Sequence, residues 1–187
     1  MVKCLVVGHG PSYRNYEFIR NFDGLILSVD ICAKDLIENE IIPDYQLFSE
    51  THETITKNVS EWISGEFIDD KIRNKMTVVH RSYAIPAMYN RVGRMKLKSI
   101  IFDADRYGNA TSVNNVGLYS IVFACDVLNA SEVHIIGLDY GNSDEYKQSL
   151  YDGWIASTYH YYRNKPNKTP IIDHSGGNFP PYDHTLY

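Results

Sequence analysis

The chain has 187 residues, of which 44% are apolar and 22% charged, and its net charge is -5. This length fits one domain with a sizeable core, and this composition excludes wholesale disorder. The acidic balance argues against nucleic acid as the main partner, because phosphate backbones bind basic faces. No apolar run approaches the ~20 residues that a membrane-spanning helix needs, so we expect no transmembrane segment.

Three cysteines, Cys4, Cys32 and Cys125, lie far apart and each stands beside apolar residues. This pattern is typical of buried, reduced thiols rather than of disulfides or metal ligands. The N-terminal apolar run is too short for a signal peptide, so we expect a cytoplasmic protein.

In chain order, short apolar runs bounded by turn residues alternate with longer amphipathic stretches. The runs predict strands at 4–7, 25–29, 45–48, 76–79, 99–102 and 133–139. The stretches predict helices at 13–22, 31–41 and 51–67, and a buried helix from near Ser112 to Leu128. This alternation predicts an α/β fold, a Rossmann-like three-layer sandwich with a mostly parallel sheet of about six strands.

Residues 1–187 are interpreted as a single nucleotide-binding domain. Residues 147–187 differ from the rest, because they are rich in Tyr, Asn, Pro and Gly. This composition predicts a lid or appended segment, with fixed bends at Gly176-Gly177 and Pro180-Pro181.

The most informative motif is the turn Gly8-His9-Gly10-Pro11-Ser12, which follows the first predicted strand. Ligands of open parallel sheets bind beyond the carboxyl ends of the strands. The glycines allow close backbone approach, and Pro11 favours a first helical turn whose free amides can bind phosphate. A dinucleotide fingerprint needs a third glycine near Tyr13, so the turn is a weak match to a nicotinamide site.

Polar residues also gather at the other predicted strand ends and at one helix start: Asp30, Ser49, Glu50, Thr111, Ser112 and Asp139. Asp30 is placed to bind a ribose hydroxyl. Thr111 and Ser112 either contact an anion or base, or merely cap the helix. Asp139 is open to two interpretations, a metal ligand or a cap for turn amides.

In the C-terminal segment, His174 stands in the Gly-rich run 173–177. Histidine titrates near neutrality, so this side chain can serve as a general base or can simply be solvated. The histidines and cysteines show no zinc-binding spacing.

Three motifs together resemble one group of Rossmann-like proteins. The turn at 8–12, the Thr111-Ser112 helix start and the strand end at 136–140 occur in the same order as in bacterial sialyltransferases, motility accessory factors and archaeal hydroxymethylpterin diphosphokinase-like proteins. The resemblance covers residues 1–146, and His174-Ser175 is a shorter, later match.

The resemblance to the sialyltransferases implies a role for each matching position. The phosphate of a CMP-sugar would be held by the turn, through Gly8, His9, Gly10 and Ser12. The nucleotide would be contacted by Thr111 and Ser112. His174 would be the general base on the acceptor hydroxyl. The departing phosphate would be stabilised by Tyr146, or by the run Tyr159, Tyr161 and Tyr162.

The chain departs from the transferases at three of these positions. They carry Asn where this chain has His9 and Asp30, and Gly where it has Val113. Asp30 fits the diphosphokinase branch better, in which acidic strand ends could hold magnesium for ATP, with Glu50 and Asp139 as the other candidates.

The leading hypothesis is a sialyltransferase-like glycosyltransferase that moves an acidic sugar from a CMP donor to a hydroxyl of a glycan or small molecule. It requires no metal or other cofactor. The alternative is a Mg²⁺-dependent pyrophosphokinase of the hydroxymethylpterin diphosphokinase type. A third hypothesis is a non-catalytic nucleotide-binding module. The sequence is also compatible with a homo-oligomer.

Overall fold

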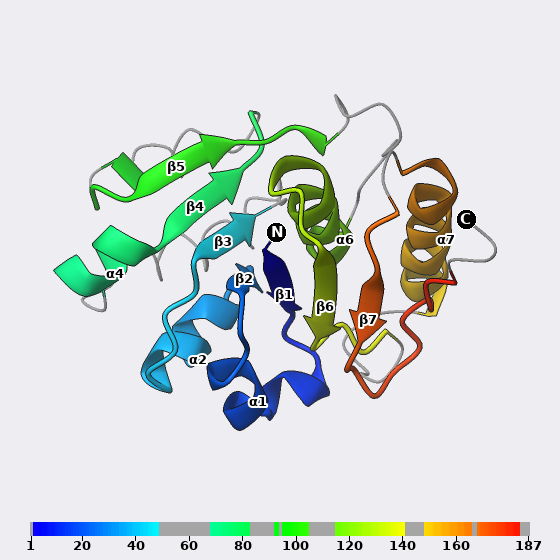
Figure 1. Ribbon diagram of the computed structural model, residues 1–187, viewed down its shortest axis with the longest axis horizontal. Helices are drawn as coiled ribbons and strands as arrows, with labels where there is room; N and C mark the ends of the chain where they lie inside the picture. The colour runs from blue at the N-terminus through cyan, green and yellow to red at the C-terminus, as the bar shows by residue number, and fades with distance from the viewer. Residues whose placement is uncertain are drawn as a thin grey trace.

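The computed structural model describes residues 2–48, 68–82, 92–93, 95–104, 115–140, 148–165 and 168–183. Their strands form one parallel sheet in the order β5-β4-β3-β2-β1-β6-β7 (Figure 1). The bounds are β1 (Lys3–Val7), β2 (Leu25–Val29), β3 (Tyr45–Phe48), β4 (Thr77–His80), β5 (Lys98–Ile101), β6 (Glu132–Ile136) and β7 (Ile171–Asp173). The predicted Rossmann-like α/β fold is confirmed, with seven strands instead of about six.

Helices cover both faces of this sheet. On one face lie a 3₁₀ turn (Pro11–Arg14), α1 (Tyr16–Arg20), α2 (Cys32–Glu38) and α4 (Asp70–Lys75). On the other lie α6 (Val116–Val122), which continues as a π-helical turn (Phe123–Val127), and α7 (Gln148–Asn164). Within the described part of the chain, no helix is both long and apolar enough to cross a bilayer.

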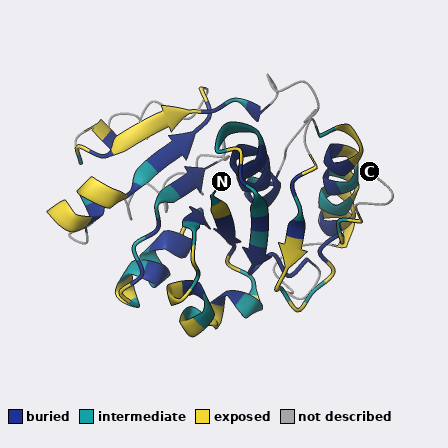
Figure 2. Cartoon of the chain, in the orientation of Figure 1, coloured by how far each residue is buried: buried dark blue, intermediate teal, exposed yellow. Residues whose placement is uncertain are grey.

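The central strands are largely apolar because both of their faces are covered. In β1, Cys4 and Val6 pack with α6 and α7, whereas Leu5 and Val7 pack with α1 and α2. Figure 2 shows the same pattern, with β1 buried and the outer helices exposed on their far sides. The turn that follows the apolar run at 4–7 therefore lies at the carboxyl edge of the sheet, between the ends of β2 and β6.

Of the expected lid or appended segment at 147–187, the structure describes residues 148–165 and 168–183, which contain α7 and β7. Tyr151, Thr158, Tyr161 and Tyr162 recur at helical spacing in α7 and are buried. Their side chains form one face of an amphipathic helix, and β7 joins the edge of the sheet beside β6. The buried tyrosines therefore belong to a core-facing helix, and α7 and β7 are part of the sandwich.

Two predicted helices begin elsewhere than expected. The buried helix starts at Val116 and not near Ser112, because the Asn115 side-chain oxygen accepts hydrogen bonds from the amides of Gly117 (2.6 Å) and Leu118 (3.1 Å). The helix predicted at 13–22 is divided at Asn15, whose side chain caps α1 by accepting from the Phe18 amide. The helix predicted at 51–67 lies outside the described residues.

Candidate functional site

The candidate site lies where the strand order reverses. β1 has β2 on one side and β6 on the other, so the chain leaves β1 in one direction and returns on the opposite side. Such a switch point is where open α/β sheets bind ligands, beyond the carboxyl ends of the strands. The predicted turn at 8–12 follows β1, and the loop at 137–140 follows β6.

These two loops are hydrogen-bonded to each other. The Gly8 amide donates to the Ile136 carbonyl and the Gly10 amide to the Gly137 carbonyl, both at 2.8 Å. Gly137 has a φ of 74°, and a Cβ on it or on Gly8 would overlap the backbone of the other. The glycines are therefore needed by the protein itself, whose loops could not otherwise approach so closely.

Asp139 is the centre of this arrangement. Its carboxylate is buried and accepts from the Ser12 amide at 3.0 Å, the Ser12 hydroxyl at 2.7 Å and the Gly176 amide at 2.9 Å. The Ser12 hydroxyl in turn accepts from the Gly137 amide at 2.8 Å. Of the two interpretations left open by the sequence, these contacts match the cap for turn amides.

The position of Asp139 affects the predicted phosphate site. Pro11 begins the 3₁₀ turn, as the sequence predicts, and the Asp139 carboxylate accepts from the amide next to it. A phosphate bound at this turn would compete with that carboxylate for the Ser12 amide, since both are anions that seek the same donor.

His9 turns away from this carboxylate toward α2. Its Nε2 lies 3.1 Å from the Asp35 carboxylate, which also accepts from the Tyr13 hydroxyl at 2.7 Å. Burial and this hydrogen bond raise the pKa of Tyr13, so its hydroxyl stays protonated. The His9 ring packs 4.8 Å from the Tyr13 ring and is 43% exposed, so the side chain remains accessible at the turn.

Asp30 lies at the carboxyl end of β2 in a left-handed conformation, with a φ of 47°. Its amide donates to the Leu47 carbonyl, and its carbonyl accepts from the buried Gln46 side chain. Non-glycine residues adopt this conformation only where their surroundings hold them in it. Asp30 thus follows the end of β2, the strand that pairs with β1, and its contact with a ribose stays a prediction.

Several predicted positions lie outside the described residues: Ser49, Glu50, Thr111, Ser112 and Tyr146. The structure does describe the α7 tyrosines that were predicted as alternatives to Tyr146. Tyr161 and Tyr162 point into the core, where their hydroxyls donate to the Asp126 carboxylate and the Pro180 carbonyl, so neither faces the strand ends. Tyr159 is half-buried on the same helix.

His174 follows β7 and is held against β6. Its Nε2 lies 2.9 Å from Nδ1 of His134, whose Nε2 lies 3.2 Å from the Glu132 carboxylate. The Phe18 ring packs 4.6 Å from the His174 ring. Burial lowers the pKa of His174, as does the neighbouring His134, so the imidazole is neutral and basic at physiological pH.

The loop that contains His174 is attached to the switch point by its neighbours. The Ser175 hydroxyl accepts from the Leu138 amide at 3.1 Å, and the Gly176 amide donates to Asp139. A Cβ on Gly177 would overlap the Asp139 backbone. The structure therefore brings the turn at 8–12, the loop at 137–140 and the loop at 174–177 together, and orients the His174 ring toward α1.

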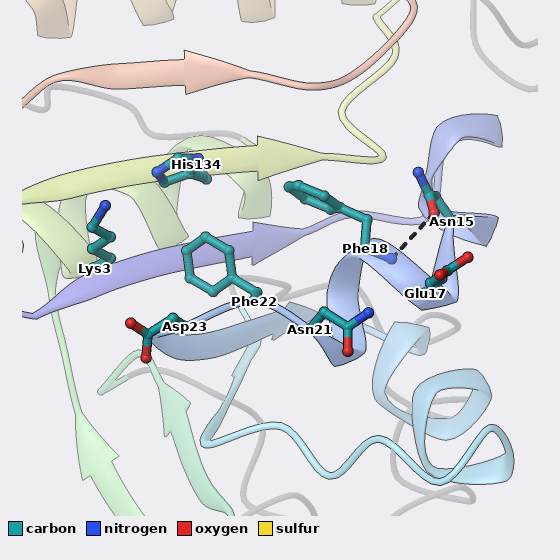
Figure 3. A pocket seen from close by; sticks show the side chains of 8 residues that line it. All are labelled: Lys3, Asn15, Glu17, Phe18, Asn21, Phe22, Asp23 and His134. Carbon is teal, nitrogen blue, oxygen red and sulfur yellow. Dashed lines mark hydrogen bonds between the residues drawn. The ribbon is translucent and has the colours of Figure 1, made fainter.

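A pocket of about 520 Å³ lies on this α1 side (Figure 3). It is lined by Lys3, Asn15, Glu17, Phe18, Asn21, Phe22, Asp23 and His134. The Phe22 ring packs 5.0 Å from the His134 ring. None of the eight residues that line it was predicted to bind a nucleotide, and His134 connects the pocket to His174.

Sequence reasoning missed several residues that shape this edge. Gln46 and His134 are polar residues inside apolar strand runs, and such positions need partners when both faces of a sheet are covered. Arg81 is buried directly after β4, with its guanidinium carbon 5.2 Å from the Tyr119 ring centroid. The polar interruptions of the predicted strands were the signal that could have identified the first two.

The alternative hypothesis assigns a magnesium ion to Asp30, Glu50 and Asp139. The described residues contain no group of three His, Cys, Asp or Glu side chains arranged to hold a metal ion. Both oxygens of Asp139 already accept hydrogen bonds from the protein. Glu50, the third expected ligand, lies outside the described residues.

Comparison with known proteins supports the fold. The structure resembles the MAf glycosyltransferase from Magnetospirillum magneticum AMB-1 with a TM-score of 0.69 and 14% identity, over 100% of this chain and 34% of that one. The chain thus spans about a third of the length of that glycosyltransferase. A protein from Lactobacillus plantarum matches with a TM-score of 0.43 and 14% identity, over 92% of this chain and 61% of that one. No protein-family model and no curated protein matches the sequence.

At this level of identity, the first resemblance establishes a glycosyltransferase-like Rossmann-type fold. Because one such fold hosts many activities, the reaction has to be argued from the site.

Proposed function

We propose that the chain is a nucleotide-sugar-dependent glycosyltransferase of the sialyltransferase type. In this proposal an acidic sugar passes from a CMP donor to a hydroxyl of a glycan or small-molecule acceptor. The observation that carries the proposal is the meeting of three strand-end loops at the switch point of a glycosyltransferase-like fold, joined through Ser12, Asp139 and Gly176. Each loop contains a motif on which the resemblance to the transferases rests.

In the proposed reaction His174 acts as the general base. Its neutral imidazole takes the proton of the acceptor hydroxyl while the oxygen attacks the anomeric carbon of the donor. The bond between that carbon and the phosphate oxygen breaks, and CMP leaves with its electron pair. The turn at 8–12 is the proposed phosphate-binding element, with the His9 side chain available as a further donor, and Tyr146 is the proposed stabiliser of the leaving group.

A non-catalytic nucleotide-binding module is the second candidate, and one observation favours it. The amides of Gly8, Gly10 and Ser12 all donate within the protein, which is the arrangement expected of a turn that serves the fold. A module of this kind would bind a nucleotide without any turnover.

The first experiment is a thermal-shift panel with CMP, CDP, UDP, NAD and ATP, each with and without magnesium. A ligand at a hundredfold excess over its dissociation constant stabilises the folded state by about 2.7 kcal/mol. The transferase predicts stabilisation by CMP without metal. Stabilisation by ATP that strictly requires magnesium would instead support the pyrophosphokinase.

Transfer itself is then measured with CMP-activated acidic sugars and a panel of hydroxyl acceptors. His174→Ala is expected to lower kcat at least a hundredfold with the donor Kd unchanged, because a general base acts on the chemical step. Transfer that is unaffected by this substitution contradicts the assigned base. CMP binding without transfer to any acceptor supports the non-catalytic module.

A further inference from the structure

Glu132, His134 and His174 form a continuous hydrogen-bonded line across the edge of the sheet. His134 and His174 have nearly parallel rings, at 5°, and their centroids lie 5.2 Å apart. The bonded nitrogens, Nδ1 of His134 and Nε2 of His174, lie 2.9 Å apart, so the centroid separation is larger by about one ring diameter. The two rings therefore meet edge to edge in nearly one plane, which is the geometry of an aligned N–H···N hydrogen bond.

The partners determine where the protons lie. The Glu132 carboxylate can only accept, so Nε2 of His134 must carry a hydrogen and donate it. Neutral His134 then has a bare Nδ1, which must accept from a hydrogen on Nε2 of His174. In neutral His174 the remaining nitrogen, Nδ1, consequently carries the free lone pair.

We infer that Glu132 and His134 are positioning residues, which hold His174 in the tautomer with a basic Nδ1 and receive its positive charge. This inference rests on the proposed role of His174 as the general base. When Nδ1 of His174 takes the acceptor proton, the O–H bond breaks and an N–H bond forms. The proton on Nε2 of His174 then crosses to Nδ1 of His134. The resulting imidazolium lies beside the Glu132 carboxylate, and CMP leaves with the electron pair of the broken glycosyl bond.

The fold fixes this line in place. His134 and Ile172 are paired in the register of β6 and β7, and the His174 amide donates to the Ile135 carbonyl at 2.8 Å. Phe18 and Phe22 pack against the two imidazoles from the α1 side. Both His174 and His134 are therefore held by backbone pairing and by aromatic contacts, which restricts their ring orientations.

The charges around the line come from four elements. Lys3 of β1 lies 3.0 Å from the Glu132 carboxylate and lowers its pKa together with His134, so Glu132 remains ionised. Asp173 of β7 opposes the decrease in the pKa of His174. Glu17 of α1 and Asp23 after it line the neighbouring pocket. The ionised Glu132 is thus the group in direct contact with the imidazole that receives the charge.

The tautomer is tested on the whole folded chain, independently of any reaction. Long-range ¹H–¹⁵N spectra of the imidazoles distinguish a protonated from a bare nitrogen. We expect one His174 tautomer in the parent protein, with a hydrogen on Nε2, and a mixture in His134→Phe. Glu132→Gln should lower the first apparent pKa of the coupled pair, and His160→Gln on the outside of α7 should change neither. An unchanged His174 tautomer in His134→Phe, or an unchanged titration in Glu132→Gln, overturns the inference.

Kinetics provide the second readout. Glu132→Gln is expected to lower kcat on the order of tenfold, with the donor KM unchanged and the acidic limb of the pH profile moved to lower pH. A merely structural role would leave the pH profile in place, and that result overturns the inference. If no donor is turned over at all, the proposed function fails, and the spectra alone decide the positioning role.

Discussion

The Asp139 carboxylate lies 2.7 Å from the Ser12 hydroxyl, although 127 residues separate them in the sequence. The same carboxylate also accepts from two backbone amides, one of them in the loop after β7. A buried charge with this many donors is held firmly, because each donor would lose its partner if the carboxylate were removed.

Asp139→Asn is expected to lower the free energy of unfolding by about 1–3 kcal/mol, because the amide NH₂ cannot accept from the donors that now face the carboxylate. Urea unfolding at neutral pH measures the change. Asp70→Asn is the matched control, since Asp70 is exposed and, among the described residues, its carboxylate bonds across one helical turn to Arg73. Its effect should stay within about 0.5 kcal/mol. Equal stability of Asp139→Asn and the parent would contradict the buried network.

The same substitution should tighten CMP binding, because it removes an anion that competes with phosphate for the Ser12 amide. Isothermal titration calorimetry of the parent and of Asp139→Asn measures the ratio of dissociation constants. Weaker binding by the variant would show that Asp139 contacts the nucleotide directly.

Two glycine substitutions are expected to change stability in opposite directions. Gly137→Ala places a side chain at a φ of 74° and against the Gly8 backbone, and should cost at least ~2 kcal/mol. Gly153 lies in α7 with open space where a methyl group would stand, so Gly153→Ala should stabilise by about 0.5–1 kcal/mol. Thermal unfolding of the two variants, compared side by side, tests whether the loops at 8–12 and 137–140 approach as described.

Stability should fall as the pH drops below about 6.5, the ordinary pKa of histidine. The pKa of His174 is lowered in the folded state, so the unfolded chain binds more protons within this window. Unfolding free energy therefore rises with pH through the window and is no longer affected by this group above it. Urea midpoints between pH 5 and 7.5 should change less steeply in His174→Gln. Parallel pH dependences of the two proteins would refute the assignment.

The three cysteines should not react with thiol reagents while the protein is folded. Burial raises the pKa of Cys4 to about 12 and that of Cys125 to about 11, and Cys32 is fully buried with its thiol donating to the Gly8 carbonyl. Reactive thiolates are scarce under such conditions. An Ellman titration at pH 8 should detect no fast thiol in the native protein and three after unfolding in guanidinium chloride.

The sequence was sufficient to predict the sheet's central strands, because 4–7, 25–29 and 133–139 are short, largely apolar runs bounded by turn residues, as expected of strands covered on both faces. It did not predict β7, since Ile171–Asp173 has three residues and only the first is buried. It also did not predict α4, a short polar helix capped by Asp69, whose side chain accepts from the Ile72 amide at 2.8 Å. The formation of such short elements depends on contacts with residues distant in the sequence, which the local pattern of apolar and polar residues does not reveal.

The motif residues of the candidate site could be located from the sequence, but their partners could not. The turn at 8–12 lies at the switch point as expected, whereas its bonds to Gly137 and Asp139 depend on which strand lies beside β1. Likewise, the neighbours of His174 depend on the register of β6 and β7, which pairs residues 38 positions apart. Strand order and register are long-range properties, so these contacts required the structure.

The strand order also has a consequence for how the chain reaches this fold. β1 is the first strand in sequence, but its second neighbour, β6, begins at Glu132. During synthesis one edge of β1 therefore has no native partner within the described sheet until Glu132–Ile136 has been made. Closing a loop of this length is entropically costly, and folds dominated by such distant pairings have high contact order and fold slowly. The bonds between the turn at 8–12 and the loop at 137–140 therefore depend on this distant pairing.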